Sequence, residues 1–248
     1  MRFKILGNVQ VEADGRTYTP SAAKIKTLLA TLLSRPGRAV STDQLVTELW
    51  GEDPPKSAHA SLYVYVSQLR KELSRLSGSD IPLETRHPGY LLKTDHQSID
   101  FHEFLRMHRS GTADFEGGNY SEALRTFDAA LAAWREEAFS DAPRGPILCG
   151  MENRIRETRL SLIELRNEAE IRLGRYSKII GELRALSEEH PFHETFQYQL
   201  MVALYKAERQ VEALDVYHRT QSLLRDELGL DPGQLLQSMQ KTILSGER

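Results

Sequence analysis

The chain has 248 residues and a formal net charge of −3, with 40% hydrophobic and 27% charged residues. This ordinary globular composition excludes collagen-like and largely disordered proteins. No apolar run approaches the roughly 18 residues that a transmembrane helix needs, and the N-terminus lacks the pattern of a signal peptide. The single cysteine, Cys149, excludes an internal disulfide, and we expect it to be a small packed thiol. We therefore expect a cytoplasmic protein of one or two domains that makes no membrane contact.

Charge is distributed unevenly along the chain. Residues 1–95 carry 13 Lys and Arg against 10 Asp and Glu, a net charge of +3. Residues 96–248 carry 19 against 25, a net charge of −6. A mildly basic half joined to an acidic half points to nucleic acid as a partner of the first and protein as a partner of the second.

The first twenty residues predict short strands. Apolar residues from Phe3 to Val11 alternate with polar ones, and Asp14-Gly15 is a strong hairpin signal. A helix follows from about Ser21, with apolar residues at helical spacing. It ends at the segment Arg35-Pro36-Gly37, since proline cannot continue a helix and glycine accepts the turn.

Two more helices and a hairpin complete this half. The first spans Ser41 to Trp50 and opens with the capping-box pattern STDQ. The second runs from Ser57 to Leu76 with an apolar stripe along one side. Strand-like segments at Ile81–Thr85 and Tyr90–Lys93 flank a Pro-Gly turn. This order predicts an α+β winged helix-turn-helix domain over residues 1–95.

The remainder of the chain is helical in pattern and contains an internal repeat. Similar segments begin at Gly118, Gly174 and Glu208, at offsets of 56 and 34 residues. Thirty-four residues is the tetratricopeptide period. The longer interval holds an irregular stretch from Phe139 to Gly150. We predict an all-α, tetratricopeptide-like domain over residues 99–248, so the fold class is mixed.

The outer face of the helix at 57–76 carries hydroxyl, amide and basic side chains, which contact base edges and phosphates in DNA complexes. Val64 lies on this face, where a thymine methyl group would give an exposed valine a contact. A solvated surface helix and a solvated turn arginine at position 86 are the alternative interpretation. The predicted DNA-binding residues are Ser57, Ser61, Tyr63, Val64, Ser67, Gln68, Arg70, Lys71 and Arg86, with Arg75 and helix N-termini as further phosphate contacts.

The segment LYVYVSQLRKEL, followed by PLETRHPGYLL, resembles the OmpR-like effector domain of the Streptomyces antibiotic regulatory proteins. Residues 99–233 are similar to the bacterial transcriptional activation domain that follows it in that family. The resemblance implies that the third helix reads the major groove of direct-repeat operators upstream of antibiotic pathway genes. It also implies that the helical half supports dimerisation and contacts RNA polymerase holoenzyme. Many OmpR-like domains have arginines at the positions of Ser67 and Gln68, so we expect readout through adenine, thymine and DNA shape.

We therefore expect a nucleoid-associated transcriptional activator of a secondary-metabolite cluster, homodimeric at least on double-stranded DNA. A repressor of the same architecture and a tetratricopeptide-like adapter are the alternatives. We expect no cofactor, no metal and no enzyme activity. His190 and His193 lack a metal motif such as HExxH. The sequence also has no GxxxxGK[ST] loop and no receiver domain, which predicts a small, stand-alone regulator.

Overall fold

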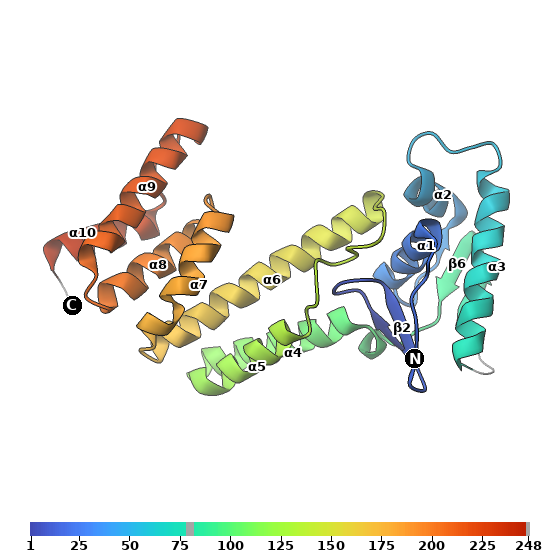
Figure 1. The fold of residues 1–248 in the computed structure, drawn as a ribbon, viewed down its shortest axis with the longest axis horizontal. Coiled ribbons are helices and arrows are strands. Elements are labelled where there is room, and N and C mark those ends of the chain that lie inside the picture. The colour runs from blue at the N-terminus through green and yellow to red at the C-terminus, as the bar shows by residue number, and fades with distance from the viewer. Residues whose placement is uncertain (78–81, 247–248) are drawn as a thin grey trace. The chain divides into compact units, whose positions relative to one another are not determined.

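The computed structural model describes residues 1–77 and 82–246, and the chain divides into two compact units (Figure 1). Unit 1 comprises Met1–Arg109 and Asp128–Leu160. Unit 2 comprises Ser110–Phe127 and Ser161–Arg248. Each unit therefore combines segments that are distant in the sequence.

Unit 1 begins with a small antiparallel sheet. Strands β1 (Arg2–Lys4), β2 (Gln10–Ala13) and β3 (Arg16–Tyr18) pair in the order β1-β2-β3. The turn between β2 and β3 contains Asp14 and Gly15, both at positive φ, a conformation that Gly and Asp adopt at low cost. The predicted hairpin is confirmed.

Three helices follow and contact one another: α1 (Ala23–Ser34), α2 (Thr42–Trp50) and α3 (Ala58–Ser77). The predicted capping box is present at the start of α2. The Ser41 hydroxyl accepts a hydrogen bond from the Gln44 amide, and the Gln44 side chain accepts one from the Ser41 amide. The apolar stripe of α3 is buried, as predicted, at Leu62, Val66, Leu69 and Leu73.

A second three-stranded sheet forms the wing, in the order β4-β6-β5. Its strands are β4 (Val40–Ser41), β5 (Leu83–Arg86) and β6 (Gly89–Leu92). Strand β4 was not predicted, because two residues carry no periodicity. Its backbone approaches β6 so closely that a Cβ on Gly89 would lie 1.9 Å from the carbonyl oxygen of Val40. Only glycine fits there, and the wing is thereby joined to the start of α2.

The two predicted hairpin strands are present with shifted bounds. The first was expected at Ile81–Thr85 and lies at Leu83–Arg86, and the second begins one residue earlier than expected, at Gly89. Ile81, Gly78 and Ser79 lie outside the described residues.

The rest of the chain is helical, as predicted. After η1 (His96–Ser98), the helices are α4 (Asp100–Glu116), α5 (Tyr120–Ala132), α6 (Pro146–Arg172), α7 (Tyr176–Glu189), α8 (Glu194–Lys206), α9 (Gln210–Leu228) and α10 (Gln234–Ser245). Helices α5, α7 and α9 begin two residues after the three predicted repeat starts. Two sets of residues at equivalent positions of the three repeats are all buried: Ala123, Ile179 and Ala213, and Phe127, Leu183 and Tyr217. None of the helices described is long and apolar enough to cross a membrane.

The irregular segment lies earlier in the sequence than the predicted stretch from Phe139 to Gly150. It covers residues 133–145, and residues 146–150 form the first turn of α6. Pro146 is the first residue of this helix, where its missing N–H costs nothing. The expectation of a packed thiol is wrong, since Cys149 on this turn is exposed.

Candidate DNA-binding interface

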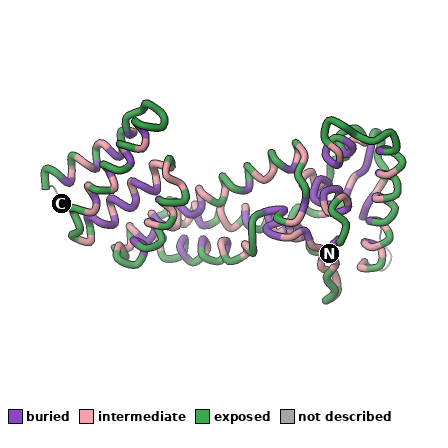
Figure 2. The backbone as a smooth tube through the Cα atoms, turned by 45° about the horizontal axis from the view of Figure 1, so that its top comes forward, coloured by how far each residue is buried: buried purple, intermediate pink, exposed green. Residues whose placement is uncertain are grey.

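The outer face of α3 presents the side chains that the sequence singled out. Ser57, Ser67, Gln68 and Lys71 are exposed and Ser61 is half-buried. Figure 2 shows exposed stretches of the backbone along α3 that alternate with buried ones. The polar residues of this face therefore carry hydroxyl and amide groups, with one lysine.

Two large apolar side chains lie in the middle of this polar face. Tyr63 is 60% exposed and Val64 is 61% exposed. Neither packs into the core, which α3 contacts through its opposite stripe. Burying such side chains would be favourable by roughly 25 cal/mol for each Å² removed from water. The face is therefore suited to covering by an apolar surface such as thymine methyl groups.

Arg70 has a different position from its neighbours on α3. Its Nε donates to the carbonyl oxygen of Leu83 at 2.9 Å, and Nη2 donates to Thr85 Oγ1 at 2.7 Å. The guanidinium lies 5.6 Å from the ring centre of Tyr90. Burial raises the pKa of the Tyr90 hydroxyl, with a smaller opposing effect from Arg70. Arg70 thus fastens the wing to α3, and a phosphate contact by it stays a prediction.

Two other arginines near this face are exposed. Arg86 lies at the end of β5, and across the described part of the chain its guanidinium makes no ion pair. Arg75 lies near the end of α3 and pairs with Glu72 at 3.1 Å. Arg86 is therefore the wing cation whose charge is uncompensated.

A buried carboxylate on α2 contacts the start of α6. Glu48 is only 4% exposed and accepts hydrogen bonds from the amides of Gly145, Ile147 and Leu148, at 3.0, 2.8 and 2.9 Å. These amides begin α6, so Glu48 caps that helix from another element. A Cβ on Gly145 would lie 2.7 Å from the Cα of Glu48. Sequence analysis missed this residue, although a Glu between Leu45 and Leu49 on an apolar face was a signal.

The histidines considered for metal binding have other contacts. His193 Nε2 contacts Glu164 Oε1, and the His193 ring packs 4.4 Å from the ring of Phe196. Among the residues that the structure describes, no group of three or more His, Cys, Asp or Glu could hold a metal ion. Nothing in this part of the chain resembles a metal centre.

Comparison with known families assigns both halves of the chain. Residues 19–92 match the family described as transcriptional regulatory protein, C terminal. Residues 99–244 match the family described as bacterial transcriptional activator domain. The order of the two matches is the order expected from the sequence.

Individual relatives agree with this assignment. Regulatory protein DnrI of Streptomyces peucetius is 34% identical over 255 residues, covering all of this chain and 93% of DnrI. Transcriptional regulatory protein EmbR of Mycobacterium tuberculosis is 35% identical over 98% of this chain and 63% of EmbR. Regulatory protein AfsR of Streptomyces coelicolor is 34% identical, and this chain covers 24% of it. The chain thus spans most of one relative and a part of the others.

A solved structure extends the likeness to three dimensions. Mycobacterium tuberculosis EmbR, in complex with a low affinity phosphopeptide, matches all of this chain and 65% of that chain, with a TM-score of 0.93 and 34% identity. The winged-helix region followed by an all-helical region is therefore shared. The chain belongs to the Streptomyces antibiotic regulatory protein family of transcriptional regulators, which join an OmpR-like winged-helix DNA-binding domain to a bacterial transcriptional activator domain and are not enzymes.

Proposed function

We propose that this regulator is an activator whose α3 enters the major groove of a direct-repeat operator while Arg86 reaches the adjacent minor groove. The supporting observation is the exposure of Tyr63 and Val64 among hydroxyl and amide side chains on one face of α3. A face of this kind matches a groove in which thymine methyl groups alternate with hydrogen-bonding base edges.

The individual roles follow from position and chemistry. Ser57 and Ser61 are short and allow the first turns of α3 to approach the DNA closely. Ser67 and Gln68 contact base edges, and a glutamine amide suits adenine N6 and N7. Lys71 contacts phosphate, with Arg75 beside it. Arg70 contributes by positioning the wing, in addition to any phosphate contact.

Assembly and recruitment complete the mechanism. Two copies bind tandem half-sites cooperatively as a homodimer on DNA, and the acidic second half contacts RNA polymerase holoenzyme. We place the domain boundary between residues 95 and 99, supported by family matches that end at 92 and resume at 99. The family resemblance supports a secondary-metabolite gene cluster as the target, and hence a place at the nucleoid.

Fluorescence anisotropy on duplex DNA from upstream of the gene tests the proposal. We expect binding in two steps that weakens as salt rises. Arg86→Ala should weaken binding and lower the salt slope by about one. Gln68→Ala should relax preference at one base pair by roughly 1–3 kcal/mol in a randomised-site selection. Arg125→Ala removes an exposed arginine on α5 in unit 2 and serves as the control.

The alternatives give different results. Absence of any complex at low salt would favour the adapter. An unchanged salt slope for Arg86→Ala would remove the wing from the interface. Transcription in vitro with purified holoenzyme then separates activation from repression, since only an activator raises transcript yield from the bound promoter.

A further inference from the structure

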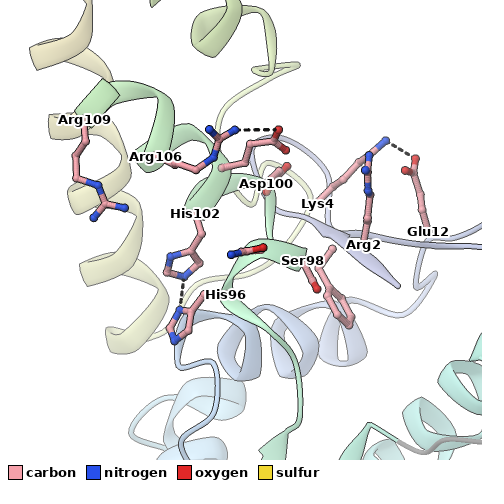
Figure 3. A pocket seen from close by; sticks show the side chains of 12 residues that line it. Arg2, Lys4, Glu12, His96, Ser98, Asp100, His102, Arg106 and Arg109 are labelled. Atoms are coloured by element: carbon pink, nitrogen blue, oxygen red, sulfur yellow. Dashed lines mark hydrogen bonds and ion pairs between the residues drawn. The ribbon is translucent and has the colours of Figure 1, made fainter. Parts of the chain in front are cut away.

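A pocket of about 610 Å³ lies within unit 1, beside the N-terminal sheet and α4 (Figure 3). Its volume falls in the range typical of small-molecule sites. None of the residues predicted to contact DNA lines it. The lining residues are Arg2, Phe3, Lys4, Glu12, His96, Gln97, Ser98, Asp100, His102, Glu103, Arg106 and Arg109.

Two of the cations around the pocket have acidic partners. Lys4 pairs with Glu12 across β1 and β2. Arg106 lies 3.9 Å from Glu103, one turn earlier on α4. These pairs leave little net charge at their own positions.

The remaining carboxylate in the pocket, Asp100, already has hydrogen-bond and ion-pair partners outside the pocket lining. Its oxygens accept the backbone amides of Ile5 at 2.9 Å and Leu6 at 3.2 Å. Arg135 lies 3.5 Å away on the same carboxylate. Burial raises the pKa of Asp100, against the opposing effects of these amides and of Arg135. Asp100 is therefore unavailable to neutralise other cations in the pocket.

Arg2 and Arg109 carry the uncompensated charge. Neither makes an ion pair or a side-chain hydrogen bond within residues 1–77 and 82–246. His96 Nδ1 and His102 Nε2 lie 3.3 Å apart beside Arg109 (Figure 3). Burial lowers the pKa of His102, and His96, Arg154 and Arg109 lower it further by charge repulsion. An anion at this end would relieve that repulsion.

We propose that the pocket binds a small phosphate ester bearing two anionic groups. One phosphate lies against Arg109, His102 and His96. The Arg109 guanidinium donates charge-assisted hydrogen bonds, and the imidazole N–H that is not used between His96 and His102 donates another. The second anionic group lies at the opposite end, where Figure 3 shows Arg2. Ser98 lies between these two ends (Figure 3), and Gln97 also lines the pocket; both supply neutral hydrogen-bonding groups. Such a ligand would contact β1 together with η1 and α4. Of these elements, η1 and α4 directly follow the wing in the chain.

Imidazole NMR signals provide a direct test on the full chain. Inorganic phosphate, titrated at constant ionic strength, should shift the His96 and His102 signals saturably, with chloride as the reference anion. Adenosine 3′,5′-bisphosphate should bind more tightly, because it carries a phosphate for each end. Substitutions His96→Gln and His102→Gln assign the two signals.

Variants separate the two ends of the pocket. Arg109→Gln should weaken both probes about tenfold, the effect of losing one charge-assisted hydrogen bond. Arg2→Gln should weaken the bisphosphate by a similar factor and leave inorganic phosphate unchanged. Arg125→Gln, on α5 in unit 2, is the matched control and should change neither affinity.

Three outcomes would overturn the proposal. The first is a shift that chloride reproduces or that does not saturate. The second is unchanged phosphate affinity in Arg109→Gln. The third is a loss of operator affinity with a reduced salt slope in Arg109→Gln or Arg2→Gln, which would assign these arginines to the DNA backbone instead. Operator affinity unchanged in both variants supports a free ligand.

Discussion

In the two compact units, the hydrogen bonds and ion pairs of carboxylate side chains join residues at very different separations along the sequence. In unit 1, the carboxylates of Glu48, Asp100 and Asp141 accept backbone amides between 94 and 132 residues away. In unit 2, the buried carboxylate of Glu170 pairs with Arg175 and Lys178, five and eight residues on. Also in unit 2, the carboxylate of Glu194 accepts the amide of Gly233, 39 residues away. The polar contacts of unit 1 therefore span longer stretches of the sequence than these contacts of unit 2.

This difference reflects two ways of building a stable fold. Helices stacked as repeats bury their apolar faces against adjacent elements and need few long-range contacts. A small sheet and three helices bury less surface alone, and residues 133–145 supply additional cover. In that segment Asp141 accepts the amide of Val9 and pairs with Lys26 at 2.7 Å. The DNA-binding unit thus depends on residues beyond its own family match.

The largest effect should come from Glu48→Ala. It removes the acceptor for three amides at the start of α6, and we expect unit 1 to lose about 4 kcal/mol. The two tryptophans, Trp50 and Trp134, both lie in unit 1, so urea unfolding followed by tryptophan fluorescence reports this unit. Exposed Glu52→Ala is the control. Equal midpoints for the two variants would refute the capping role.

Leu204→Ala makes the complementary change in unit 2. Leu204 is fully buried among α7, α8, α9 and α10, and the cavity should cost about 3 kcal/mol. Because the cluster around Leu204 lies within unit 2, the loss should appear in far-ultraviolet circular dichroism at lower urea, with the tryptophan midpoint unchanged. A parallel fall in both midpoints would show that the two units unfold together. The units would then not differ in how their stability is built.

Gly89→Ala tests the close approach within the wing. The added methyl meets the Val40 carbonyl at a distance that forces β4 and β6 apart. We expect a loss of about 2 kcal/mol in stability and weaker operator binding. Gly150→Ala is the control, because nothing lies within 4 Å of its added Cβ and alanine favours a helix. Wild-type DNA affinity in Gly89→Ala would show that DNA binding does not depend on the geometry of the wing.

The smallest effect concerns pH and His102. Its folded-state pKa is lowered, first by burial, so below about pH 6.5 the unfolded chain binds a proton that the folded chain does not. The stability of unit 1 should therefore fall as pH drops from neutral through this window, and level off below the folded pKa. His102→Gln should remove part of that slope, measured by urea unfolding at several pH values. An identical slope would exclude His102 as a source.

Local periodicity made much of the fold predictable. The capping box at Ser41, the stripe of α3 and the repeats beginning at residues 118, 174 and 208 are all patterns within one or two turns. Strand β4, the role of Glu48 and the start of α6 were not predicted, because each depends on a partner far along the chain. Exposure of the outer face of α3 was predictable from helical geometry. The Arg70 contact with the wing was not, since it depends on where β5 lies.

The cap that Glu48 provides for α6 also has a consequence for synthesis on the ribosome. Proteins fold from the N-terminus as the chain emerges. The partners of Glu48 are residues 145, 147 and 148, and unit 1 extends to Leu160. When residues 1–95 emerge, Glu48 has no amides to bind, and a buried carboxylate without a partner opposes compaction. Unit 1 is therefore completed only after the first residues of α6, which belong to the activator domain, have been translated.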